Sequence, residues 1–347
     1  MTAPAAMNPT DRLSGLRRAK RALAFIAPLL ALAVVWLGMF AFAPGFGAWD
    51  NQRLILTQAA IVAAAAIGAT IVIIAGGIDL SVGSAVALVT MFIALLLNRG
   101  AGPLVAVLGG IAAGGVVGLL IGGLVVGWVL PRLPLSPFIV TLALWGALRG
   151  VAKGIGGNQP IYVSESAGES NMGWLPWLMN GSDSGLLHEI VPAVWLVAAC
   201  GLAVTLVLNR TILGRRAFAI GGNEHAARIC GVPVPATKFM LYGLAGLCTG
   251  LAGVLQFSFV PQGDPTAAQG LELKVIAAVV IGGASLSGGA GSVLGTLAGI
   301  LIMTIVDNGC TKLRLDNWVQ EIVTGGIILI AVAVDRLRLR AQRAGTS

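Results

Sequence analysis

The residue with the most informative chemistry is Asp79, which stands in a Gly-Gly-Ile-Asp-Leu-Ser run at positions 76–81, between two long apolar stretches. A carboxylate at the centre of a membrane helix costs about 2.5–3.5 kcal/mol on insertion scales, so such a residue indicates a functional role. Two roles fit the position. Asp79 either caps the next helix by accepting hydrogen bonds from free backbone N–H groups, or contacts a polar solute or a gate.

A second glycine-rich run, Gly-Gly-Ala-Ser-Leu-Ser at positions 282–287, matches the first. The match indicates an internal repeat, although glycine-rich membrane segments also match by chance. Paired interruptions of apolar segments point to a transport pathway, because non-helical backbone inside a membrane is tolerated only where protein buries it or a cavity adjoins it. The residues predicted to form helix breaks or the translocation pathway are Gly76, Gly77, Asp79, Ser81, Gly282, Gly283, Ser285 and Ser287.

A different pattern, Gly-Gly-Asn-Glu-His-Ala-Ala-Arg-Ile-Cys-Gly, occupies positions 221–231 within a basic region. Its asparagine is a good N-cap for a short helix. The run is either an ordinary solvated connector or a helix that a soluble partner grips. In the second case the predicted coupling residues are Asn223, Glu224, Ala226, Ala227 and Gly231.

The chain offers no recognisable catalytic site. It contains no Gly-Lys pair, hence no Walker A motif and no ATP site, and no His-Glu-x-x-His metal motif. Its two histidines, His188 and His225, are expected on opposite sides of a membrane, so neither forms a catalytic dyad with the serines of the repeat. We expect no enzyme activity, no metal and no cofactor in this chain.

The composition identifies the class of protein. Apolar residues make up 57% of the chain and charged residues 10%, and the mean hydropathy is +0.91. A soluble domain usually carries about 25% charged residues, and a disordered chain is poor in apolar ones. The 49 glycines have no three-residue period, which excludes collagen, and the continuous apolar runs lack the alternation of barrel strands. An all-α polytopic membrane protein is predicted.

Apolar runs recur throughout residues 22–335, the predicted transmembrane domain. When the short runs are counted, about ten transmembrane helices are expected. The expected spans are 22–43, 54–75, 82–97, 104–130, 137–155, 190–208, 239–260, 273–281, 291–306 and 318–334.

The net charge of +8 indicates membrane topology and not nucleic-acid binding. Fourteen of the 22 basic residues gather in three segments, and no basic stripe with interleaved aromatic residues is present. The positive-inside rule makes these segments cytoplasmic: a tail at 1–21, a loop at 210–238 and a second tail at 336–347. The loop at 156–189 contains no lysine or arginine and is expected on the outer side of the membrane.

Three stretches together, at 75–84, 219–231 and 279–289, carry a resemblance to a known family. Their order and spacing resemble the monosaccharide ABC importer permeases of the ribose, xylose, arabinose and galactofuranose type. The resemblance implies a bacterial inner-membrane subunit that works with a second permease subunit and a periplasmic sugar-binding protein. It also implies a cytoplasmic ABC ATPase that binds the ATP and Mg²⁺ and grips the loop around Glu224. Two departures, Ile121 where related permeases have asparagine and a long outer loop, leave the sugar open.

Weaker polar candidates lie elsewhere. Arg149 and Lys153, near the outer end of the 137–155 span, either snorkel to the membrane surface or contact solute or a partner. Several indoles either anchor the protein at the membrane interface or stack on a sugar ring. These are Trp128, Trp145, Trp195 and Trp318.

The resulting interpretation is a permease subunit of an ABC importer that translocates a monosaccharide, in contact with membrane lipid and with both termini cytoplasmic. One alternative is an ion-coupled secondary transporter in which Asp79 binds a proton or sodium ion. A non-transporting scaffold would leave Asp79 and the repeat without a purpose. Within the ABC class, permeases for a nucleoside, an autoinducer or a branched-chain amino acid are the near rivals.

Overall fold

A computed structural model describes residues 27–130, 133, 135–163, 165–166, 169–170, 172–181 and 190–344 of the chain. The predicted tail at 1–21 and parts of the predicted outer loop at 156–189 lie outside the described residues.

The described chain is a bundle of helices. Six helices are long and apolar enough to cross a membrane, and shorter apolar helices lie at Ala27–Phe42, Val82–Asn98 and Trp318–Ala333. The prediction of a polytopic helical protein is confirmed at this level, whereas the count of ten spans remains a prediction. The helices are α2 (Trp49–Ile74), α3 (Val82–Asn98), α4 (Pro103–Val125), α5 (Pro137–Ile155), α6 (Trp177–Asn180), α7 (Pro192–Arg210), α8 (Ile212–Gly222), α9 (Glu224–Ile229), α10 (Val234–Phe259), α11 (Leu271–Ile281), α12 (Val293–Lys312) and α13 (Asn317–Ala344).

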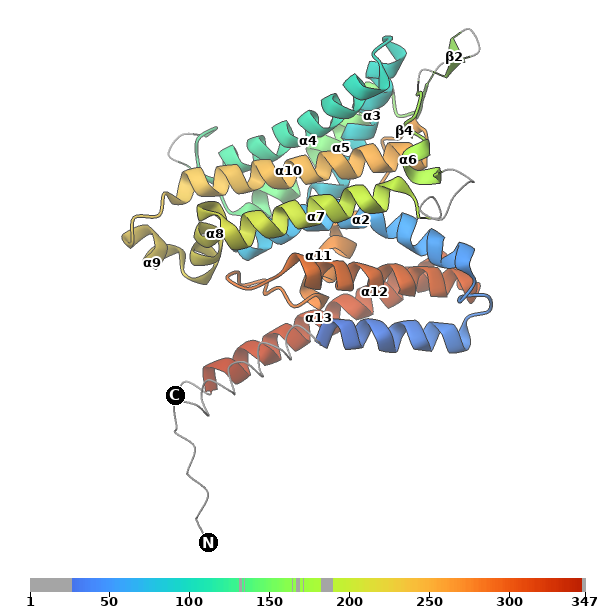
Figure 1. Cartoon of the computed structure of the whole chain (residues 1–347). Coiled ribbons are helices and arrows are strands. Elements are labelled where there is room, and N and C mark those ends of the chain that lie inside the picture. Colours follow the sequence, from blue (N-terminus) through green and yellow to red (C-terminus); the bar gives the residue numbers. More distant parts are fainter. Residues whose placement is uncertain are drawn as a thin grey trace.

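Two short antiparallel strand pairs accompany the bundle. β1 (Ile161–Tyr162) pairs with β4 (Gln262–Gly263), and β2 (Glu165–Ser166) pairs with β3 (Glu169–Ser170). Figure 1 shows the long helices side by side, with α8 and α9 at one end of the bundle and α6 and β4 at the opposite end. The loop predicted to couple and the loop predicted to face outward therefore lie at opposite ends.

Helix α2 forms the centre of the bundle, where it contacts α7, α10, α11 and α12. Its middle is a run of alanines, and the side chains from Ala64 to Ile67 are fully buried. Without the hydrophobic effect to drive helices together in lipid, close packing of small residues provides much of the attraction. The small side chains of α2 allow several helices to approach it at once.

Helices α4 and α10 cross at two pairs of glycines spaced four residues apart. A Cβ atom on Gly114 would lie 2.5 Å from the carbonyl oxygen of Gly246, and one on Gly250 would lie 2.7 Å from the Cα of Ile111. A Cβ on Gly118 would meet the carbonyl oxygen of Tyr242. Small residues at this spacing are the common device for backbone contact between membrane helices.

Gly118→Val is expected to lower the free energy of unfolding by about 1–3 kcal/mol or more, because the side chain collides with backbone that has no freedom to move. The measurement is the melting temperature of the protein in mild detergent. Gly146→Val is the matched control, since Gly146 lies on α5 with no atom within 4 Å of its Cβ position. Equal melting temperatures for the two variants would contradict this packing.

Candidate functional site

The two glycine-rich runs end their helices in the same way. At the end of α2, Gly76 has φ +79°, and its N–H donates to the oxygen of Ile73 at 2.9 Å. At the end of α11, Gly283 has φ +91°, and its N–H donates to the oxygen of Val280 at 2.9 Å. Left-handed backbone of this kind favours glycine at helix C-termini. The structural match pairs Gly76 with Gly283, one residue later than the sequence match predicts.

Gly282 remains glycine for another reason. Its backbone has φ −66°, which any residue adopts. A Cβ there would collide with the backbone of Gly295 in α12. The close approach of α11 and α12 therefore explains why position 282 is a glycine, and the backbone conformation of the turn does not.

After the glycines, the two runs share a second feature and then diverge. Asp79 Oδ1 accepts hydrogen bonds from the backbone N–H of Ser81 at 2.8 Å and from its hydroxyl at 2.7 Å. Ser285 Oγ likewise accepts from the N–H of Ser287 at 3.3 Å. Ser81 itself is the N-cap of α3, so the Asp79 carboxylate orders the turn before the helix without reaching its first-turn amides. After Ser287, by contrast, α12 begins only at Val293.

The three sequence stretches meet at one backbone contact, which we call the glycine junction: Gly76, Gly221, Gly288 and Gly289. The N–H of Gly289 donates to the oxygen of Ile74 at 2.9 Å. A Cβ on Gly221 in α8 would collide with that same oxygen and with the nitrogen of Gly289. One on Gly288 would lie 2.8 Å from the Cα of Gly221 and 2.9 Å from the Cα of Gly76. The end of α8 is thus packed directly against both glycine-rich runs.

Helix α9 continues from the junction and is held by local polar contacts. Asn223 Oδ1 accepts from the N–H of Ala226 at 2.9 Å, which is the N-cap that the sequence predicts. Ala227 is buried against neighbouring apolar side chains, whereas Ala226 and Gly231 are exposed. Gly231 ends the segment with φ +81°. The side chain of Ile229 is 74% exposed at the end of α9.

Glu224 ties α9 to the start of α10. Its Oε2 pairs with Lys238 Nζ at 2.7 Å, and its Oε1 pairs with Arg228 Nη2 at 3.2 Å. Partial burial raises the pKa of Glu224, but the hydrogen bonds and charges of Lys238 and Arg228 outweigh this effect and lower the pKa below its ordinary value of 4.5. Glu224 therefore stays ionised at neutral pH and fixes α9 relative to α10.

Comparison with known proteins shows the family of the chain. The family described as "Branched-chain amino acid transport system / permease component" matches residues 53–332. The chain belongs to this permease family. The permease is 36% identical to the ribose import permease protein RbsC of Escherichia coli (strain K12) over 307 residues, 88% of this chain and 92% of the relative.

Two further relatives agree in length and similarity. The ribose import permease protein RbsC of Bacillus subtilis (strain 168) is 38% identical over 311 residues, 90% of this chain and 92% of its own. The L-arabinose transport system permease protein AraH of Escherichia coli (strain K12) is 35% identical over 316 residues, 91% of each chain. No solved structure matches the permease significantly.

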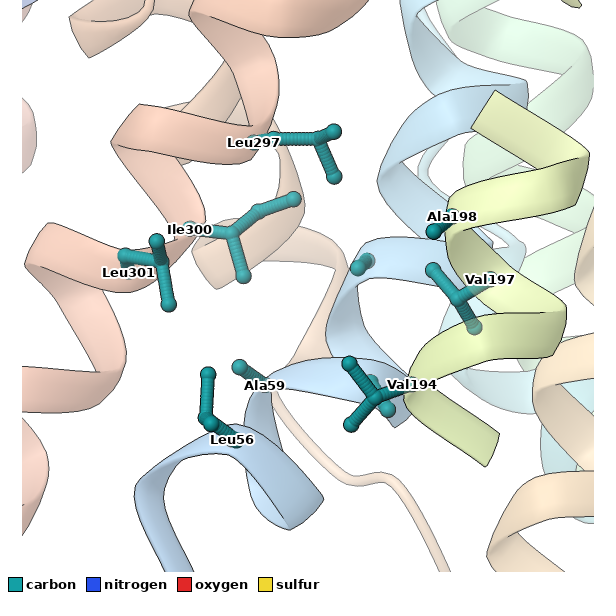
Figure 2. Close-up of a pocket in the computed structure, with 10 residues that line it drawn as sticks. Leu56, Ala59, Val194, Val197, Ala198, Leu297, Ile300 and Leu301 are labelled. Atoms are coloured by element: carbon teal, nitrogen blue, oxygen red, sulfur yellow. The ribbon is translucent and has the colours of Figure 1, made fainter. Parts of the chain in front are cut away.

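A hydrophobic pocket of the permease is unsuited to a polar solute. Figure 2 shows this pocket between α2, α7 and α12, where it has a volume of about 170 Å³. Its lining is aliphatic, so it offers no side-chain partner for a hydroxyl group. The lining residues are Leu56, Ala59, Ala60, Ala63, Val194, Val197, Ala198, Leu297, Ile300 and Leu301.

Arg149, one of the weaker candidates from the sequence, has a structural role. Arg149 does not snorkel: its Nη1 donates to the backbone oxygens of Pro265 at 2.9 Å and Ala267 at 2.7 Å, so it holds the loop before α11. No sequence pattern singles out Tyr242 on α10. Its buried hydroxyl lies against Gly77 and has no hydrogen-bond partner in the described structure. No group of three His, Cys, Asp or Glu residues in the described ranges is arranged to hold a metal ion.

Asp79→Ala is expected to lower the stability of the permease by about 1–3 kcal/mol, because the buried N–H and hydroxyl of Ser81 lose their acceptor. Asp79→Asn is the matched control, since it keeps an acceptor oxygen of the same shape and is expected to lose less. The readouts are the melting temperature in detergent and sugar uptake in cells. If Asp79→Ala leaves both at the wild-type level, neither turn ordering nor solute contact matters at this position.

Proposed function

We propose that the chain is the membrane-spanning permease subunit of an ABC importer for a monosaccharide of the pentose class, delivered by a periplasmic binding protein. The names of its relatives support the sugar, since they include ribose and L-arabinose permeases. The observation that carries the proposal is the glycine junction, because it connects a soluble partner at α9 directly to the end of α2 and to the segment between α11 and α12.

The coupling would run through this connection. A cytoplasmic ABC ATPase binds ATP and Mg²⁺ and grips α9, where Ile229 is exposed and Glu224 fixes the helix to α10. Closure of the ATPase moves α9 and α8, and Gly221 transmits the movement to both glycine-rich runs. The permease then shifts from an outward-open to an inward-open state, because the closed ATPase makes more favourable contacts with the second state than with the first.

The proposed topology has ten spans in the bacterial inner membrane, with α8, α9 and both termini on the cytoplasmic side. The basic residues at the ends of α7 and α13 support this orientation, because the positive-inside rule expects them on the cytoplasmic side. A second permease subunit pairs with this one, the solute passes between the two, and the remaining apolar surface contacts lipid.

The family description favours a second substrate class, branched-chain amino acids. Such a solute is a zwitterion with an aliphatic side chain, whereas a pentose presents only hydroxyl groups. The named relatives that cover about nine-tenths of the chain transport sugars, which makes the sugar the first choice.

The test is purification of the tagged permease from its native membrane in mild detergent, with identification of the proteins that accompany it in stoichiometric amounts. We expect an ABC ATPase, together with a binding protein whose ligand is then measured with D-ribose, L-arabinose and L-leucine. A pure chain without an ATPase that still takes up solute along an ion gradient would contradict the proposal.

A further inference from the structure

A cluster of polar side chains lies where α3, α5 and α11 meet, apart from the glycine junction. Trp145 Nε1 on α5 donates to Glu272 Oε1 on α11 at 3.0 Å, and Ser84 Oγ on α3 donates to the backbone oxygen of Trp145 at 2.7 Å. Arg149 lies one helical turn beyond Trp145. We call Trp145, Arg149 and Glu272 the indole cluster.

Two atoms of the indole cluster are buried and unpaired within the described structure: Glu272 Oε2 and Arg149 Nη2. The Glu272 residue is only 7% exposed. A buried polar atom without a partner costs about 1–3 kcal/mol, more when the group is charged, so such atoms are rare and need an explanation. A ligand that both accepts from a guanidinium and donates to a carboxylate would satisfy the two atoms together.

The backbone around Glu272 is shaped to leave its carboxylate room. Gly83, in the first turn of α3, has no side chain, and a Cβ there would collide with Glu272 Oε2 and with the backbone oxygen of Ala268. The first turn of α3 therefore faces the first turn of α11. Interrupted helices whose N-termini converge inside a bundle are the usual construction of solute sites in transporters.

One side of the indole cluster is open. Trp145 is 41% exposed, and helix α5, which carries it, is among the least enclosed in the bundle. Trp145 thus combines partial exposure with a hydrogen bond to the buried carboxylate. Movement of α5 relative to α11 would break that bond and uncover the unpaired atoms.

We infer that the indole cluster is a monosaccharide contact site on the translocation path, an inference that rests on the proposed function. The Trp145 face covers the C–H surface of the sugar ring, Glu272 accepts a hydroxyl hydrogen, and Arg149 donates to a hydroxyl oxygen. The hydroxyl groups of a sugar suit both atoms, because a hydroxyl group can donate one hydrogen bond and accept others. A contact of this small size also permits release, which a transport site requires.

The test uses the complete importer in proteoliposomes, with separate measurement of ATP hydrolysis and of uptake of labelled D-ribose and L-arabinose. Trp145→Ala and Glu272→Gln are expected to lower the sugar transported per ATP by about tenfold, equivalent to about 1.4 kcal/mol, and to change the ribose-to-arabinose ratio. Trp145→Phe, which keeps an aromatic face, is expected to restore part of the loss. Trp49→Ala is the matched control, because Trp49 is 52% exposed at the start of α2 and its indole makes no hydrogen bond in the described structure.

The outcomes separate the site from the proposed function. Wild-type coupling and sugar ratio in Trp145→Ala and Glu272→Gln would overturn the site alone. If the variants lose ATPase stimulation and complex yield to the same extent as uptake, and the ribose-to-arabinose ratio is unchanged, the residues serve packing. This result would also overturn the site. If Trp145→Ala fails to fold, Trp145→Phe and Glu272→Gln decide. A wild-type importer that moves neither sugar would overturn the proposed function, and the site with it.

Discussion

Replacing Gly221 with alanine is expected to abolish sugar uptake, or to reduce it by more than about tenfold. The added methyl group would collide with the oxygen of Ile74 and the nitrogen of Gly289, which are backbone atoms of the end of α2 and of the segment between α11 and α12. Neither side can yield without separating α8 from the glycine-rich runs, since close-packed interiors do not absorb an extra methyl group at such a contact. The measurement is uptake of labelled pentose in cells that contain equal amounts of folded permease.

The neighbouring residue supplies the control. Gly222 belongs to the same helix, and no atom lies within 4 Å of its Cβ position. In a helix, alanine is more stable than glycine by about 1 kcal/mol, so Gly222→Ala is expected to be neutral or slightly stabilising. Normal uptake by Gly221→Ala would show that the glycine junction does not transmit movement.

Glu224→Arg is expected to uncouple ATP hydrolysis from transport while leaving the transmembrane bundle folded. The change replaces two ion pairs with repulsion among three cations, because Lys238 and Arg228 lie on either side of the carboxylate. Helix α9 would lose its fixed position on α10. The measurement compares ATPase activity, sugar uptake and melting temperature. Uptake should fall while the melting temperature changes little, because ion pairs near a protein surface contribute about 0–1 kcal/mol each.

A charge exchange provides the control for Glu224. The double variant Glu224→Lys with Lys238→Glu restores an opposite-charge pair and is expected to recover part of the uptake that Glu224→Lys alone loses. Normal uptake by Glu224→Arg, or no recovery in the double variant, would contradict the docking role.

The lowered pKa of Glu224 also fixes the direction of a pH effect. A group whose pKa is lower in the folded state stabilises that state above its unfolded pKa, here 4.5, and the contribution disappears as the pH falls through the folded value. The contact between α9 and α10 is therefore expected to persist from neutral pH down to at least 4.5.

Local signals in the sequence predict the helices well. The predicted span at 137–155 coincides with α5 because Pro137 marks the first turn of the helix. Asn223 was predictable as an N-cap because its partner lies three residues away. The glycine-rich runs were recognisable because glycine is preferred where a helix ends in left-handed backbone.

Contacts between distant segments were not predictable from the same signals. Gly221 meets Gly76 and Gly288 across more than sixty residues in either direction, and one sequence carries no record of such pairing. Glu272 lies just before the predicted span at 273–281, and no motif in the sequence singles it out. Arg149 binds backbone carbonyls, which every residue possesses. The side chains of the loop before α11 therefore give no indication of the contact.

The most direct test of the central claim is solute uptake by the purified components in proteoliposomes. The permease is reconstituted with its ATPase, and the binding protein loaded with labelled D-ribose is added on the side of the membrane opposite α9. We predict uptake that requires both ATP and the binding protein and that persists when ionophores collapse proton and sodium gradients. Uptake by the permease alone, driven by an ion gradient and abolished in Asp79→Asn, would contradict the account and make the chain a secondary transporter.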